Sequence, residues 1–192
     1  MPQIATHELR QIPLRVHNFL ADVPLHDVWA IDLARKRPGL TLDAFLGATS
    51  SHLFTPSPVV RRLLRIRFFF GHVFGWDRED GASTRESFAS RLTGEDRARS
   101  LAATGANDGP FRVVYRFENE QLSEIVNGTA HAAMLSALVE TDGSYRFYLA
   151  VYVRRVSLLT PLYMAAIDPF RKLIVYPSLL QNVRTSWDRT LS

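Results

Sequence analysis

The residues able to do chemistry are spread through the chain without forming a recognisable catalytic motif. The six histidines lack metal-ligand spacing such as H-E-x-x-H, and there is no cysteine. Thiolate catalysis, disulfides and cysteine-ligated metal sites are therefore excluded. The sequence contains none of the patterns G-x-S-x-G, G-x-x-x-x-G-K-[ST] and G-x-G-x-x-G. We expect no metal and no cofactor, NAD included.

His131 is the first residue to consider as a catalytic base. It lies in "TAHAAMLSALVE", and strand alternation places it on the same side as Glu124 and Arg154. A cross-strand polar cluster explains that set better than catalysis does. We therefore assign no catalytic residue.

Length and composition indicate one globular domain. The chain has 192 residues, of which 46% are hydrophobic and 22% charged. Net charge is +4, but acidic residues are scattered among the arginines, so we expect no nucleic-acid partner. The local cluster Arg61, Arg62 and Arg65 predicts a solvated helix face, with an anionic head group or an acidic partner as the alternative.

The most apolar stretch, Ser157 to Leu180, is long enough to cross a membrane. Asp168, Arg171 and Lys172 lie in its middle, where charges are costly in a bilayer. The N-terminal residues lack the apolar region of a secretory signal. We expect a cytoplasmic protein with no transmembrane segment.

Two hairpin signals organise the second half of the chain. Asn127-Gly128 and Asp142-Gly143 are typical two-residue turns, so residues 110–156 predict an antiparallel β-meander. A two-residue turn would pair Val126 with Thr129. Parity then assigns one face to the core: Ile125, Ala130, Ala132, Met134, Ser136, Leu138, Phe147, Leu149, Val151 and Val153. The opposite face, which we expect to be solvent-facing, receives Glu124, His131, Arg146, Tyr148, Tyr152 and Arg154.

The first strand of the meander joins the core face only under one condition. Phe111, Val113, Tyr115 and Phe117 point inward if an odd number of residues separates the strands. We therefore predict a three-residue turn or a bulge near Glu118 to Gln121.

The remaining elements follow from helix and strand patterns. Residues 1–25 predict an irregular segment, and residues 26–186 a single domain. Within it we expect a strand at 26–33, helices at 41–75, a connecting segment at 76–109 and a C-terminal helix at 160–184. That helix starts at Thr160-Pro161, kinks at Pro169 and turns its charged residues Asp168, Arg171 and Lys172 away from the sheet. Its apolar stripe comprises Leu162, Tyr163, Ala166, Phe170, Leu173 and Ile174.

Two stretches carry a family resemblance. "IVNGTAHAAMLSALV", followed by "YLAVYVRRVSLLTPLYMAAIDPFRKLIV", resembles the bacterial family called domain of unknown function 2867. Its members look like START/Bet v 1-like (SRPBCC) helix-grip proteins. The resemblance implies an α+β helix-grip fold, in which a curved antiparallel sheet wraps around a long C-terminal helix with a cavity between them. It implies no established chemistry.

Such a cavity would be lined by the core face of the sheet and the stripe of the helix. Small residues at the centre of the face would leave room for a ligand. The expected pocket residues are Trp29, Tyr115, Ala132, Met134, Ser136, Phe147, Tyr163 and Phe170.

Three functions remain open. The first is a domain that binds a small apolar or aromatic ligand. The second is a cyclase or hydrolase that uses Tyr115 or Ser136 as acid or base. The third is an interaction protein without a ligand, which docks or forms a homodimer through Tyr148 and Tyr152. We favour binding over catalysis because no pair of convergent titratable groups is apparent.

Overall fold

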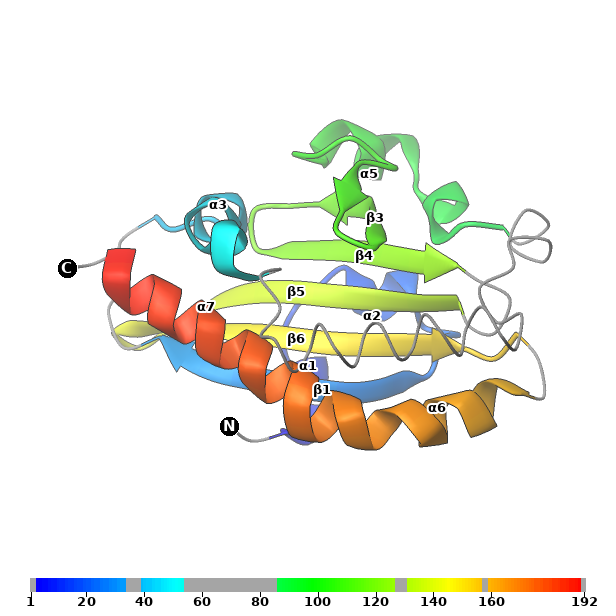
Figure 1. Cartoon of the computed structure of the whole chain (residues 1–192). Coiled ribbons are helices and arrows are strands. Elements are labelled where there is room, and N and C mark those ends of the chain that lie inside the picture. Colours follow the sequence, from blue (N-terminus) through cyan, green and yellow to red (C-terminus); the bar gives the residue numbers. More distant parts are fainter. Residues whose placement is uncertain (1–2, 34–38, 54–85, 127–130, 157–158, 191–192) are drawn as a thin grey trace.

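One antiparallel sheet, covered on both faces, forms the centre of the protein. The computed structural model describes residues 3–33, 39–53, 86–126, 131–156 and 159–190 (Figure 1). The expected helix from Ser57, the cluster Arg61, Arg62 and Arg65, and the rest of the stretch 54–85 lie outside these residues.

The sheet has six strands in the order β1-β6-β5-β4-β3-β2, and all neighbouring strands are antiparallel. The strands are β1 (Leu25–Leu33), β2 (Asn107–Asp108), β3 (Phe111–Arg116), β4 (Glu120–Val126), β5 (His131–Thr141) and β6 (Ser144–Arg154). The pairing of β1 with β6 places the N-terminal strand beside the strand that leads into the C-terminal helix. The sheet is curved (Figure 1).

The β5–β6 hairpin has the expected two-residue turn. Thr141 pairs with Ser144, and Gly143 has a φ of +82°, which side chains disfavour and glycine accepts. The β4–β5 ladder differs, because Val126 pairs with His131 instead of Thr129. The difference is two residues, so parity is preserved and Met134 keeps its predicted face.

The β3–β4 hairpin has its irregularity in another place than expected. Arg116 pairs with Gln121, so an even number of residues separates the strands, and the bulge lies between Val113 and Tyr115. A bulge reverses the facing of the residues beyond it. Val113 therefore keeps the predicted face, whereas Tyr115 points to the other side of the sheet.

Helices pack on both sides of this sheet. They are α1 (Thr6–Arg10), α2 (Val16–Phe19), α3 (Leu42–Leu53), η2 (Phe88–Arg91), α5 (Gly94–Arg99), α6 (Leu159–Phe170), the π-helical turn η3 (Arg171–Val175) and α7 (Tyr176–Thr190). Figure 1 shows α6, α7 and α3 in front of the sheet and α1 and α2 behind it. None of the helices in the described ranges is long and apolar enough to span a membrane.

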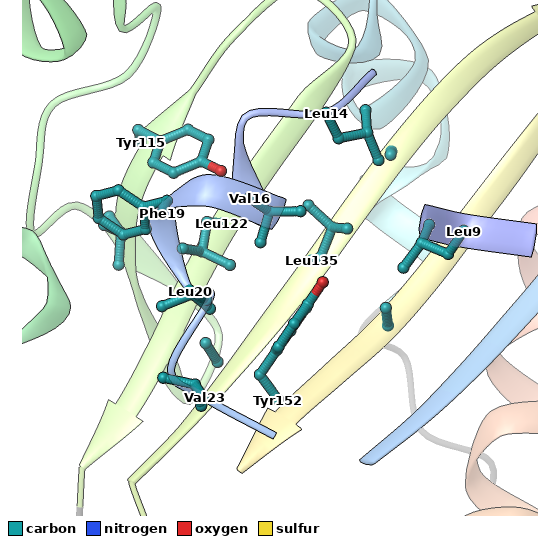
Figure 2. Packing of buried hydrophobic residues seen from close by; sticks show 14 of the residues in the cluster. Leu9, Leu14, Val16, Phe19, Leu20, Val23, Tyr115, Leu122, Leu135 and Tyr152 are labelled. Atoms are coloured by element: carbon teal, nitrogen blue, oxygen red, sulfur yellow. The ribbon is translucent and has the colours of Figure 1, made fainter. Parts of the chain in front are cut away.

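The N-terminal residues, which we expected to be irregular, contribute buried side chains to one of the two hydrophobic core clusters. Leu9, Val16, Phe19 and Leu20 of this segment are buried against Leu122, Leu135 and Tyr152 of the sheet (Figure 2). The expected solvent-facing side is therefore covered: Tyr148 and Tyr152 are only 6% and 4% exposed. Burial of apolar side chains stabilises these short helices, whose intrinsic propensity alone would not.

The C-terminal helix has a different buried side from the predicted one. Met164, Tyr176, Leu180, Val183 and Trp187 pack in the core between helices and sheet. Phe170 and Leu173 of the expected stripe are instead 50% and 77% exposed. Phe170 precedes the π-helical turn and lies about 120° around α6 from the buried Met164. The turn changes the phase of the helix from Arg171 onward, so a uniform 3.6-residue period misassigns Leu173.

Candidate functional site

The structure divides the expected pocket residues between different surfaces. Trp29, Ala132, Met134, Ser136 and Phe147 share the sheet face that the C-terminal helix covers. Two rows of paired residues cross this face from β1 to β4. One is Asp27–Val151–Met134–Ser123, and the next is Trp29–Leu149–Ser136–Gln121.

Two expected pocket residues, Tyr115 and Phe170, do not join that face. Tyr115 lies on the opposite side because of the β3 bulge, and its hydroxyl donates to Glu120 Oε1 at 3.3 Å. Phe170 is half exposed, because it lies about 120° around α6 from Met164, which is buried. The side chain of Tyr163 lies outside the described part of the chain.

A buried polar cluster occupies the edge of the helix-covered face, and it begins with Asp27. A bulge in β1 between Leu25 and Asp27 sends Leu25 to the N-terminal core and Asp27 toward the helix. Asp27 has no exposed surface. Its Oδ2 accepts a hydrogen bond from Arg171 Nη2 at 3.2 Å.

The π-helical turn brings Arg171 and Tyr176 together. In an α-helix, residues five apart point about 140° away from each other. In this turn the Tyr176 N–H bonds to the Arg171 carbonyl, five residues back, and the side chains meet. Arg171 Nε donates to Tyr176 Oη at 2.9 Å, and Nη2 contacts the same oxygen.

Three further polar contacts, all to Asp168, extend the cluster toward the surface. Arg171 Nη1 donates to Asp168 Oδ1 at 2.8 Å, and Lys172 Nζ lies 3.3 Å from Asp168 Oδ2. His26 Nε2 contacts the same carboxylate at 2.9 Å. Burial works against ionisation of Asp168, but the His26 hydrogen bond and the two cations hold its pKa below the ordinary value.

The same groups resemble a metal-ligand set but are already neutralised. Ligand atoms of His26, Asp27 and Asp168 lie within 4.8 Å of one another. Arg171 and Lys172 pair with these carboxylates, so a divalent cation would have to displace one or both. The arrangement is better suited to an ion-pair network than to a metal centre.

Two buried polar atoms in this cluster have no hydrogen-bond partner within the described residues: Asp27 Oδ1 and Trp29 Nε1. Both side chains leave β1 toward the helix, two residues apart. The Trp29 ring lies 5.2 Å from the Tyr176 ring, centroid to centroid, so contacts run from Asp27 through Arg171 and Tyr176 to Trp29. Burial raises the pKa of Asp27, although Arg171 opposes the effect.

Sequence reasoning placed the charged residues of this site in solvent. Asp168 and Arg171 were assigned to the outer side of the helix, yet both face β1. One signal was available for Asp27. It has the parity of Trp29 and Ile31, so it belongs to the core face of its strand, where an unpaired carboxylate is unusual.

His131 belongs to a separate cluster on the other face. Its Nε2 contacts Glu124 Oε2 at 2.8 Å, and its ring stacks on Phe88 at 3.8 Å between centroids. Glu124 also accepts hydrogen bonds from the Ser87 hydroxyl and, at 2.9 Å, from the Phe88 N–H. The cluster is the expected cross-strand polar group, but it is buried and fixes the start of η2 to the sheet.

Comparison with known proteins identifies the family. No curated protein and no solved structure gives a significant match. A family model matches residues 19–178, which include every residue of the Asp27 cluster. Because this match covers most of the chain, the protein belongs to the family described as "Protein of unknown function (DUF2867)".

Proposed function

We propose that the chain is a helix-grip domain of the START/Bet v 1-like kind that binds a small, largely apolar or aromatic molecule between the sheet and the C-terminal helix. The observation that carries this proposal is a pair of buried atoms, Asp27 Oδ1 and Trp29 Nε1, that have no hydrogen-bond partner among the residues that the structure describes. A buried polar group without a partner costs about 1–3 kcal/mol. A ligand that bonds to both atoms recovers that free energy on binding.

The π-helical turn supports the same location. Such turns sacrifice regular hydrogen bonding and are concentrated at functional sites. Here the turn sets Arg171 and Tyr176 side by side beneath β1. A regular α-helix would serve a purely structural packing role with less strain.

The sheet supplies a surface for the body of the ligand. Met134 lies two strands from Asp27 in the same row, a distance of about 10 Å at ordinary strand spacing. Met134 and Ala132 are half-buried, and Ser136 lies in the adjacent row. A ligand of two fused rings, or an eight-carbon chain, matches this length.

The other two functions have less support. The acid or base residues considered for an enzyme, Tyr115 and Ser136, lie on opposite faces of the sheet. The aromatic residues considered for docking, Tyr148 and Tyr152, are buried under the N-terminal segment. Neither pair forms a site.

A thermal-shift screen of the purified protein against fatty acids, polyketides, sterols and aromatic metabolites tests the proposal. A ligand at 100-fold its dissociation constant stabilises by about 2.7 kcal/mol, which raises Tm by several degrees. We expect a saturable rise in Tm for the wild type and none for Ala132→Trp, because the indole would occupy the space proposed for the ligand beside Met134. A well-folded protein with no shift across the panel, or the same shift in Ala132→Trp, contradicts the proposal.

A further inference from the structure

We infer that the ligand enters with an uncharged head group that both donates and accepts hydrogen bonds, of which a carboxamide is the simplest example. This inference rests on the proposed function and specifies its chemistry. It follows from which bonds Asp27 and Trp29 can still make, and from the charge balance around them.

Asp27 Oδ1 and Trp29 Nε1, which lack partners in the described part of the chain, need different groups from a ligand. The Trp29 indole N–H can only donate, so the ligand must bring an acceptor. Asp27 Oδ1 accepts when the carboxyl group is ionised, so the ligand must also bring a donor. An ammonium has no acceptor for Trp29, and a carboxylate has no donor for Asp27. A carboxamide has both, and its oxygen also suits Asp27 in the protonated form.

The charges of the cluster are already paired. Asp27 and Asp168 face Arg171 and Lys172, with nitrogen–oxygen distances of 2.8–3.3 Å. An ionic ligand would add an unpaired charge beside Asp27, which has no exposed surface. A neutral ligand leaves the balance intact.

Arg171, the obvious anchor for a carboxylate, is occupied. Its Nε donates to Tyr176, its Nη1 to Asp168, and its Nη2 to Asp27. The fork geometry that binds carboxylates with two parallel hydrogen bonds is therefore directed at the protein's own groups. An acidic ligand would have to break one of these bonds in order to use it.

Three matched probes test the inference: 2-naphthamide, 2-naphthoate and 2-naphthylmethylamine. They share a two-ring body of the length between Asp27 and Met134 and differ in the head group. We expect the amide to bind at least about ten-fold more tightly than either charged probe in calorimetric titration at neutral pH, which corresponds to one hydrogen bond kept or lost.

Two variants connect the preference to the site. Trp29→Phe removes the indole donor and should weaken amide binding about ten-fold. Trp187→Phe is the matched control, because Trp187 Nε1 is also buried and unpartnered within the described ranges but lies about 16 Å along α7 from Tyr176. It should leave binding unchanged. Asp27→Asn retains the side-chain shape but removes the negative charge that faces Arg171. It should therefore weaken binding of the cationic amine further and increase the difference between the amide and the amine.

The outcomes separate this inference from the proposed function. If the carboxylate or the amine binds more tightly than the amide, and Ala132→Trp abolishes that binding, the inference of a neutral head group is refuted. The proposed binding function would then still hold. Equal amide affinity in Trp29→Phe and the wild type would also refute it. If neither the probes nor the broad screen gives a ligand, both proposals are wrong.

Discussion

At the scale of single residues, Arg171 has the greatest influence on the site. It bonds to Asp27 of the first strand, to Asp168 of its own helix and to Tyr176 beyond the π-helical turn. Asp27 is fully buried, and Arg171 donates a hydrogen bond to its Oδ2. The pair therefore decides whether the carboxyl group of Asp27 can be ionised in the folded protein.

Arg171→Met should destabilise the protein by about 3–5 kcal/mol at pH 7, because it leaves a buried charge without its partner. The loss should be smaller near pH 4. Burial already raises the folded-state pKa of Asp27, and without Arg171 this pKa would rise further. The variant therefore loses free energy of unfolding once the pH exceeds the pKa of Asp27 in the unfolded state, and the loss grows with pH. Adding Asp27→Asn should recover part of the loss. Urea unfolding of the wild type, of Arg171→Met, of Asp27→Asn and of the double variant measures the recovery. Equal stability of Arg171→Met and the double variant would contradict the argument.

Glu120 is the second residue with a strong influence, on the opposite face. Its Oε1 accepts hydrogen bonds from the Arg15 N–H at 2.9 Å and from the Tyr115 hydroxyl, and Oε2 has no partner within the described residues. Burial raises the pKa of Glu120 to about 7, against the smaller opposing effect of the hydrogen bonds and of the Arg15 charge. Two tyrosines interact with this carboxyl group. Burial raises the pKa of Tyr115 well above its ordinary value and that of Tyr152 to about 12.

The free energy of unfolding should therefore fall as pH rises from about 4.5 to about 7, since the folded state holds this proton more tightly than the unfolded state. Below that window both states are protonated, and above it the penalty stays constant at about 3 kcal/mol. Glu120→Gln has no ionisable group at this position. The difference in free energy of unfolding between this variant and the wild type should therefore shift in favour of the variant by about 3 kcal/mol from pH 4.5 to pH 8. Glu118→Gln, at an exposed position of the same turn, is the control. Parallel wild-type and Glu120→Gln curves would refute the assignment.

At the scale of elements, irregularities decide which residues share a face. The bulge before Asp27 and the bulge before Tyr115 each change the face of the sheet to which the following side chains point. The π-helical turn changes the orientation of the side chains in the C-terminal helix. The Asp142-Gly143 turn and the parity of Met134 could be predicted, because they depend on local turn chemistry and strand alternation. The bulges could not be located, because an extra residue in a strand leaves no local sequence signal.

Deleting Leu173 should convert the π-helical turn into regular α-helix and rotate α6 by about 100° relative to α7. Arg171 would then leave Asp27, and we expect a loss of stability like that of Arg171→Met, with helical content by circular dichroism unchanged. Leu173→Ala is the control. It should change stability by less than about 0.5 kcal/mol, since this side chain is 77% exposed. If the deletion is as stable as the substitution, the turn does not position Arg171.

At the scale of the whole molecule, the chain covers both faces of its sheet. Sequence patterns identified the sheet, the helix-covered face and the C-terminal helix. They did not identify the second layer, because α1 and α2 have only five and four residues. Helices this short are formed by tertiary burial and not by propensity, so their sequence resembles an irregular segment. The polar residues His131 and Glu124 on that face also indicated solvent, although their pairing allows burial.

Substitution of two phenylalanines tests whether the sheet is covered on both faces or on one face only. Phe19 is buried in the N-terminal layer, edge-on to Tyr115 at 5.4 Å between centroids, whereas Phe170 on the C-terminal helix is half exposed. Phe19→Ala should reduce the free energy of unfolding by about 3–5 kcal/mol and Phe170→Ala by less than about 1 kcal/mol. Urea denaturation of the two variants beside the wild type measures the difference. The reverse order would mean that the helix stripe expected from periodicity forms the core and that the N-terminal segment only rests on the sheet. A larger loss for Phe19→Ala than for Phe170→Ala would show that the N-terminal layer is part of the core. Because loss of that layer would expose an apolar sheet face, we expect the sheet and both of its helical coverings to unfold as one cooperative unit.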